Sequence, residues 1–275
     1  MHEWELLAAG GFPAAGLGTT YQPGRPPWPP EVQRRIQALW ARRRRAAHRA
    51  GRTFYNGRLF RVQAFTPAAA GLTLALADTD YREYVAARAG LLPAGQADPL
   101  GVAAALITAD SRILIGRRRG VDTYTGRYDV IGGFVDREVD WQQTAGPATP
   151  DPAGAMVREV WEETGVGLAR TVLICLGLVY DRSVPHPTLC FAARLPLAFA
   201  DLAALPVQEQ ETAGWEPLPD DPAALSAFLT EHHGALSPTA EATLALWGEQ
   251  AYGRAWWDAL VASLGGRAAE PKPES

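Results

Sequence analysis

The sequence is almost without lysine, has few cysteines and contains no long apolar run. Of its 26 basic residues only Lys272 is a lysine, and the bias accompanies abundant alanine, glycine and proline throughout the 275 residues, as a GC-rich genome produces. Cys175 and Cys190 are too few for a disulfide framework and stand in apolar runs, so we expect buried thiols. No apolar stretch approaches the ~20 residues that cross a bilayer, and the N-terminus lacks a signal-peptide pattern. We expect a cytoplasmic protein without a membrane partner.

An excess of positive charge is also missing. The net charge is −4, whereas a dedicated nucleic-acid binder normally carries a basic footprint, so we expect no nucleic-acid partner. The one basic run, 42–45, either faces solvent on a helix or holds an anionic partner. Hydrophobic residues make up 47% of the chain, which is enough to bury a core. The length allows one large domain or two small ones.

Two features divide the chain. Residues 19–30 are rich in proline and predict an extended arm, and Asp98-Pro99 marks a boundary after which the sequence pattern changes. We therefore expect an N-terminal α+β region at 1–99 and a second domain at 100–275. Asn56-Gly57, within the alternating segment 54–65, predicts a hairpin turn. Apolar periodicity, caps and turn residues predict helices at 31–50, 81–88, 152–164, 222–232 and 239–264, and strands at 72–76, 102–108, 113–115, 128–131, 172–180, 189–195 and 215–218. This mixture predicts an α+β or α/β/α sandwich.

The helix predicted at 152–164 has signals at both ends. Asp151 suits the N-cap, Pro152 the first helical position and Gly165 the C-terminal cap. We expect the apolar stripe of this helix to face inward, and its members are Val157, Val160, Trp161 and Thr164.

Three glutamates occupy another face of the same helix. Glu159, Glu162 and Glu163 stand at i, i+3 and i+4, and no lysine or arginine follows within reach. Like charges at this spacing destabilise a helix by roughly 0.2–0.5 kcal/mol each, and near its C-terminus they oppose the helix dipole. A hard divalent cation with oxygen ligands would neutralise them, whereas the alternative is a solvated acidic helix end.

Residues 158–166, Arg-Glu-Val-Trp-Glu-Glu-Thr-Gly-Val, preceded by Ile131-Gly132-Gly133, resemble the Nudix box, G-x5-E-x7-R-E-U-x-E-E-x-G-U, where U is aliphatic. The second half matches at every fixed position: Arg158, Glu159, Val160, Glu162, Glu163, Gly165 and Val166. The first half departs from the pattern, because Gly133 and Arg158 are 25 positions apart instead of fourteen, so about eleven residues are inserted. The composition of the inserted piece, around 141–150, predicts a loop. Val139 stands where the first glutamate belongs, between Glu138 and Asp140, and this leaves that role open.

The resemblance implies a Nudix-type α/β/α sandwich with a mixed central sheet, and a hydrolase in which divalent ions assist attack of water on a diphosphate. Arg158 would orient one of the glutamates by a charge-assisted hydrogen bond. The implied ligands of Mg²⁺, or of Mn²⁺ as its substitute, are Glu159, Glu162, Glu163 and a main-chain carbonyl of Gly132 or Gly133.

Nudix enzymes often recruit a further carboxylate from a late loop. The candidates are Glu209, as a metal ligand, and Glu211, in catalysis; either is otherwise an ordinary surface acid. His186 stands between two prolines, where a general acid/base role competes with that of a passive loop residue.

Three further segments, 54–62, 78–88 and 98–108, resemble the UDP-glucose/UDP-galactose pyrophosphatase branch, which implies a small-molecule nucleotide sugar cleaved to UMP and hexose 1-phosphate. Uracil would then stack on Phe54, Tyr55 or Phe60, with Asn56 and Arg58 as polar partners. One arginine of the run 117–119 would contact phosphate, and we choose Arg118. The alternative is a hairpin whose aromatic residues simply pack on the core.

Two other functions stay open. One is hydrolysis of ADP-ribose or another nucleoside diphosphate derivative with the same metal chemistry. The other is a non-catalytic Nudix-fold ligand sensor, which has no need to retain Arg158 together with all three glutamates of the helix. The sequence leaves the oligomeric state undetermined.

Overall fold

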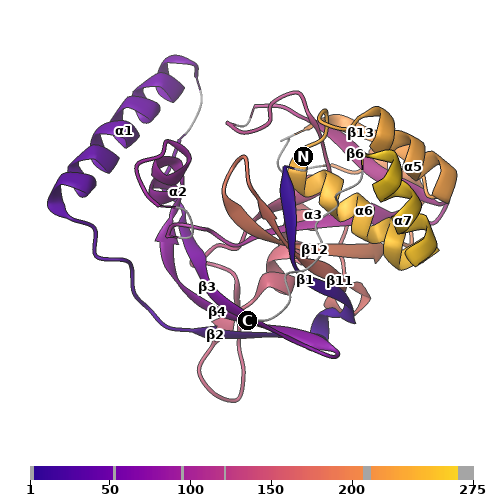
Figure 1. Ribbon diagram of the computed structural model, residues 1–275, viewed down its shortest axis with the longest axis horizontal. Coiled ribbons are helices and arrows are strands. Elements are labelled where there is room, and N and C mark those ends of the chain that lie inside the picture. The colour runs from indigo at the N-terminus through magenta and orange to yellow at the C-terminus, as the bar shows by residue number, and fades with distance from the viewer. Residues whose placement is uncertain (1–2, 52–53, 94–95, 121, 207–211, 266–275) are drawn as a thin grey trace.

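The computed structural model describes residues 3–51, 54–93, 96–120, 122–206 and 212–265, and its helices and strands form a mixed α/β fold (Figure 1). The helices are α1 Pro30–Arg49, α2 Tyr81–Arg88, α3 Pro152–Thr164, α4 Phe199–Ala203, α5 Pro222–Glu231, α6 Pro238–Tyr252 and α7 Arg254–Ser263. The strands are β1 Trp4–Pro13, β2 Leu17–Tyr21, β3 Arg58–Ala68, β4 Gly71–Asp80, β5 Gly101–Ile107, β6 Arg112–Arg118, β7 Tyr128–Asp129, β8 Ile131–Phe134, β9 Trp141–Gln142, β10 Thr149–Pro150, β11 Ile174–Asp181, β12 His186–Arg194 and β13 Thr212–Pro219.

A large mixed sheet forms the centre of the fold. Its strands follow the order β1-β11-β12-β5-β6-β13, with β7 added on β6 and β8 on β5. β12 runs parallel to β5, and the other pairs in this sheet are antiparallel. A separate three-stranded sheet has the order β2-β4-β3. The mixed sheet agrees with the predicted fold class.

The large sheet is covered on both faces, as the alternation along β5 shows. Val102, Ala104 and Leu106 pack with α3 and the small sheet, whereas Ala103 and Ala105 pack with α5, α6 and α7. Successive side chains of a strand point to opposite faces, so an unbroken apolar run such as this one belongs to a strand that is buried on both sides. The result is the predicted α/β/α sandwich.

Helices α1 and α2 lie at the opposite end of the molecule from α5–α7 (Figure 1). They share a small apolar cluster in which Ile36, Leu39 and Trp40 of α1 meet Val85 and Ala86 of α2. This cluster holds α1 against α2, and Arg43 of α1 lines the cleft described below.

Several predictions about single elements are wrong. Asn56-Gly57 is no hairpin turn: it precedes β3, whose antiparallel partner is β4, and Asn56 Oδ1 accepts a hydrogen bond from the Arg82 amide at 2.8 Å. The helix predicted at 239–264 is two helices, because Gly253 (φ 89°) ends α6 and begins α7. The inserted loop carries the short β9-β10 ladder.

Strand β1 was not predicted, and it joins the large sheet by pairing with β11. The first residues of the chain thus contribute to the same sheet as the residues after Pro99. The division into regions 1–99 and 100–275 stays a prediction.

Both cysteines are buried and free, as expected, and burial raises the pKa of each thiol to about 12. Within the described ranges, none of the helices combines the length and the apolar character that a membrane span requires.

Candidate active site

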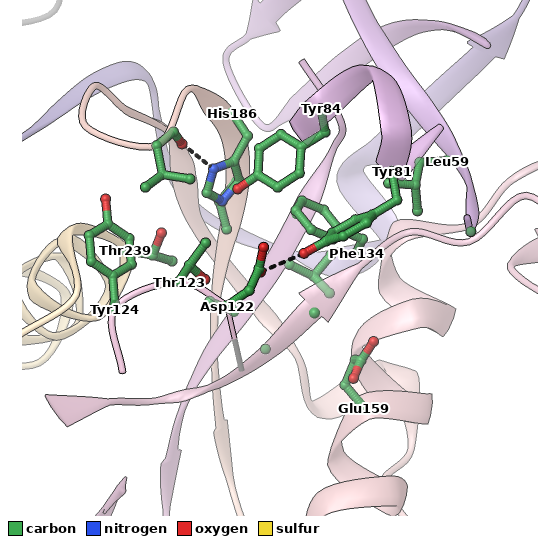
Figure 2. Close-up of a pocket in the computed structure, with 18 of the residues that line it drawn as sticks. Leu59, Tyr81, Tyr84, Asp122, Thr123, Tyr124, Phe134, Glu159, His186 and Thr239 are labelled. Atoms are coloured by element: carbon green, nitrogen blue, oxygen red, sulfur yellow. Dashed lines mark hydrogen bonds between the residues drawn. The ribbon is translucent and has the colours of Figure 1, made fainter. Parts of the chain in front are cut away.

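A cleft of about 600 Å³ lies between the α1–α2 end of the molecule and the large sheet with α3 (Figure 2). One wall carries acidic side chains of α3, Glu159 and Glu162, and another carries the rings of Tyr81 and Tyr84 from α2. The cleft is therefore acidic on one side and aromatic on the other, a combination suited to a ligand with a phosphate part and a ring part.

The helix with the acidic wall forms as the sequence predicts. Asp151 Oδ1 accepts from the Gly154 amide at 2.8 Å, and Gly165 ends the helix in the left-handed conformation (φ 71°). One member of the predicted inward stripe is wrong: Trp161 is 47% exposed, and Met156 packs in the core instead.

Arg158 organises the carboxylates around it. Its guanidinium donates to Glu159 Oε1 at 2.9 Å, to Glu162 Oε2 at 2.8 Å and to both oxygens of Asp140 at 3.0 and 2.8 Å. Burial alone would lower the pKa of this guanidinium, but the hydrogen bonds to Asp140 and the negative charges around it outweigh burial and raise that pKa. Arg158 therefore stays charged and holds two of the three helix glutamates in fixed positions.

Asp140, which directly precedes the inserted loop, is the residue that pairs with Arg158. The Nudix box pattern did not decide which of residues 138–140 takes the place of the first glutamate. Val139, at the nominal position of the first glutamate, is 62% exposed, and Glu138 makes only a loose surface pair with Arg58 at 3.6 Å. Asp140 is buried and also accepts from the Asp136 amide at 2.7 Å. The sequence offered one signal for this role, namely that Asp140 is an acidic residue one place after the nominal position of the first glutamate.

Gly132 and Gly133 bring the backbone of β8 against α3. The Gly132 amide donates to Glu163 Oε1 at 3.2 Å, and this carboxylate is buried. A Cβ atom at Gly133 would lie 2.1 Å from Glu159 Oε1, so only glycine lets this carboxylate rest on the strand.

The three glutamates supply the oxygen donors that a hard divalent cation takes. Among the described residues, however, no three His, Cys, Asp or Glu side chains are gathered closely enough to hold a metal ion. Glu159 and Glu162 hold the Arg158 guanidinium, and Glu163 accepts from Gly132. The donors fit a cation by their chemistry, and the cation would have to compete with Arg158 for two of them.

The predicted substrate-binding residues fall into two groups. Phe54 and Arg118 line the cleft, and Arg118 ion-pairs with Asp129 and donates to the Thr123 carbonyl at 3.1 Å. Asn56 and Arg58 are not among its lining residues; they make the contacts with Arg82 and Glu138 given above.

Of the three rings considered for stacking, Tyr55 also lines the cleft and is 73% exposed. Phe60 is fully buried, packs edge-on against Tyr21 and Trp141, and belongs to the core. Glu209 and Glu211 lie outside the described residues.

The end of the cleft away from α3 contains residues that the sequence did not bring together. His186 lines it, with Tyr84 and Phe134 packed edge-on against the imidazole at centroid distances of 5.8 and 5.5 Å, and Gly101 and Thr188 beside it. Figure 2 shows Phe134 between His186 and Glu159. We call these five residues, Tyr84, Gly101, Phe134, His186 and Thr188, the inner subsite.

Comparison with known proteins supports the interpretation of the motif. The family model of the NUDIX domain matches residues 98–219, which contain β5–β13, α3 and the acidic wall. This part of the chain is therefore similar to a NUDIX domain. No curated relative matches the chain.

Solved structures with some similarity include the NUDIX domain of Shewanella oneidensis NrtR complexed with ADP ribose (20% identity, 45% of this chain and 73% of that chain, TM-score 0.34). A MutT/nudix family protein from Enterococcus faecalis is 20% identical over 46% of each chain, with a TM-score of 0.34. A bifunctional NMN adenylyltransferase/ADP ribose pyrophosphatase from Francisella tularensis, complexed with AMP and a Mn ion, is 15% identical over 61% of this chain and 46% of that chain, with a TM-score of 0.36. Similarity at this level carries no information on the substrate of this chain.

Proposed function

We propose that this protein hydrolyses the diphosphate bond of a nucleoside diphosphate sugar, UDP-glucose or UDP-galactose, to UMP and hexose 1-phosphate. The observation that carries the proposal is the position of Glu159 and Glu162, held by Arg158 on the wall of a cleft whose other wall is aromatic. The NUDIX domain match covers this acidic wall. We also propose that the protein acts in the cytoplasm.

The proposed cofactor is Mg²⁺, with Mn²⁺ as a substitute. Glu159, Glu162, Glu163 and a carbonyl of Gly132 or Gly133 would hold it. When bound, such an ion neutralises a diphosphate and lowers the pKa of a coordinated water. Glu209 as a further ligand and Glu211 as a catalytic carboxylate are proposals from the sequence alone.

The chain's own residues would orient the substrate. Arg158 prevents Glu159 and Glu162 from turning away from the cleft, because each carboxylate accepts one of its N–H groups. Arg43 and Arg118 line the cleft and supply forked donors suited to phosphate oxygens. Phe54 and Tyr55 offer ring surfaces for uracil.

The test is a substrate panel of UDP-glucose, UDP-galactose, ADP-ribose, NADH and diadenosine polyphosphates, each with Mg²⁺ or Mn²⁺. We expect turnover of the UDP-sugars and a loss of at least about 100-fold in Glu162→Gln and in Glu163→Gln, because the donors for the cation are removed. Glu138→Gln, at an exposed acid that precedes the inserted loop, is the matched control and should retain activity.

Each other outcome has a definite meaning. Full activity of the Glu162→Gln/Glu163→Gln double variant would rule out this mechanism. Turnover of ADP-ribose with UDP-sugars untouched would refute the substrate assignment and favour the other nucleoside diphosphate derivatives. Thermal stabilisation by one compound without any turnover would favour a ligand sensor.

A further inference from the structure

We propose that the inner subsite binds the sugar ring of the substrate, a neutral group rich in hydroxyls, and that His186 and Thr188 form hydrogen bonds with those hydroxyls. The identity of the sugar-bearing substrate rests on the proposed function. The chemistry of the subsite rests on its own residues.

Two polar side chains of the subsite share one face of one strand. His186 and Thr188 stand at i and i+2 on β12, so both point to the same side of the sheet. Gly101 of β5 pairs with Thr188, and a Cβ atom there would lie 2.8 Å from Thr188 Oγ1 and 3.3 Å from His186 Cδ2. The glycine thus lets both polar side chains approach the backbone of β5, and a larger residue there would displace them.

Each of these side chains has an unused hydrogen-bonding atom. His186 Nδ1 lies 2.6 Å from the Val184 carbonyl oxygen; because a carbonyl only accepts, Nδ1 carries the proton and Nε2 is an acceptor. No described residue forms a hydrogen bond with Nε2. Thr188 Oγ1 is buried and has no partner among the described residues. A buried hydroxyl without a partner is unfavourable, so a ligand that supplies the missing partner gains affinity.

The surrounding protein keeps the imidazole neutral and in place. Burial lowers the pKa of His186, although the charge of Asp181 opposes this. The Asp181 carboxylate accepts from the Ser183 and Val184 amides at 2.8 Å each and from the Tyr124 hydroxyl at 2.7 Å, which fixes the turn that presents the Val184 carbonyl. Tyr124 adopts a left-handed conformation (φ 51°), which is uncommon outside glycine and is found at functional sites.

The charged groups near the subsite already have partners. Asp122 accepts from Tyr81 at 2.6 Å and from Arg88 at 2.9 Å, Asp181 has the three donors named above, and Arg118 ion-pairs with Asp129. What remains toward the ligand is one neutral acceptor, one hydroxyl and the rings of Tyr84 and Phe134. These groups fit an uncharged ring with hydroxyl groups better than they fit a phosphate or a carboxylate.

A nucleobase fits the subsite less well than a sugar. Tyr84 and Phe134 pack edge-on against each other, 5.2 Å between centroids, and against His186, so these three rings already pack on one another in a T-shaped arrangement. The ring of Tyr55, elsewhere on the lining, is 73% exposed and offers a surface on which a flat base can stack. Phe134 lies between His186 and Glu159, which agrees with a diphosphate at α3 between the base and the sugar (Figure 2).

The deciding experiment compares Thr188→Val and His186→Phe with the wild type. Titration with glucose 1-phosphate, UMP and inorganic phosphate, each with Mg²⁺, measures affinity without any need for turnover. We expect each variant to weaken glucose 1-phosphate by about tenfold or more and to leave UMP and phosphate within about twofold, because a site built to hydrogen-bond a hydroxyl loses affinity when that bond is removed. Thr243→Val, a buried threonine of α6 that does not line the cleft, is the matched control and should change none of the three.

The melting temperature of Thr188→Val is a second measurement, because it should fall if Thr188 only stabilises the fold. Valine has nearly the same shape and lacks the unpartnered hydroxyl, so the melting temperature of the variant should stay constant or rise while sugar affinity falls. A fall in melting temperature with unchanged glucose 1-phosphate binding would overturn the proposal.

The subsite and the proposed function fail in different ways. If the wild type hydrolyses UDP-sugars but both variants bind glucose 1-phosphate normally, the subsite assignment is wrong and the hydrolase stands. If glucose 1-phosphate binds and both variants weaken it, but no UDP-sugar is hydrolysed, the subsite is supported and the proposed function is refuted. Equal weakening of UMP and glucose 1-phosphate would also contradict a sugar-specific subsite.

Discussion

The pair between Asp140 and Arg158 gives the sharpest prediction about stability. Asp140→Ala removes two hydrogen bonds from the Arg158 guanidinium and one from the Asp136 amide. The two side chains are 4% and 25% exposed, and removing one partner of a buried pair costs about 3–5 kcal/mol. Arg158 keeps Glu159, Glu162 and the Phe134 carbonyl as partners, so we expect a smaller loss than this, about 2–3 kcal/mol.

The assay is urea unfolding of Asp140→Ala and of Glu138→Ala, with equal m-values required for the comparison. Glu138 and its partner Arg58 are 64% and 65% exposed, so Glu138→Ala should change the free energy of unfolding by no more than about 0.5 kcal/mol. Equal losses in the two variants, or a loss below about 1 kcal/mol in Asp140→Ala, would refute the assignment of Asp140 as the partner of Arg158.

Three further predictions concern the site and the core. Gly133→Ala places Cβ against the carboxylate of Glu159, which can shift by rotating its side chain, so activity should fall by at least about tenfold while the melting temperature changes little. Gly132→Ala instead places Cβ 2.5 Å from the Val102 carbonyl oxygen and should lower the melting temperature; activity assays with calorimetry separate the two variants. Burial lowers the folded-state pKa of His186 below 6.5, so the unfolded chain takes up the proton first as the pH falls. The free energy of unfolding should therefore decrease as the pH drops from about 6.5 to the folded-state pKa. Urea unfolding across this range should show a smaller dependence of this free energy on pH in His186→Gln than in the wild type, and an equal dependence would contradict the argument. Phe60→Ala should destabilise by about 3–5 kcal/mol and Tyr55→Ala by less than about 0.5 kcal/mol, and similar values for both would contradict the placement of Phe60 in the core.

Local signals sufficed to predict α3 and its glutamates. Asp151 begins that helix and Gly165 ends it through contacts with near neighbours in the chain, so the sequence around the helix was enough to predict its two ends. The hairpin turn predicted at Asn56-Gly57 is wrong because asparagine favours two different local structures. Its side chain can accept a hydrogen bond from a helix amide, as it does here, or it can stand in a tight turn.

The remaining features depend on tertiary contacts. Asp140 could not be chosen over Glu138 or Val139, because the path of the inserted loop decides which side chain meets Arg158. The inner subsite needs Gly101 of β5 beside Thr188 of β12, and no pattern within either strand specifies that register. Strand β1 was missed for the same reason, since its partner β11 lies far along the chain.

The pairing of β1 with β11 has a consequence for synthesis on the ribosome. Glu5 of β1 and its ion-pair partner Arg182 are 177 residues apart, and at about 5–20 residues per second roughly 10–35 s pass between their synthesis. Throughout that interval Trp4 and Leu6, which end up buried, have no sheet to join. The apolar residues of β1 therefore join their sheet late, and until then they are exposed to chaperones and to aggregation during translation.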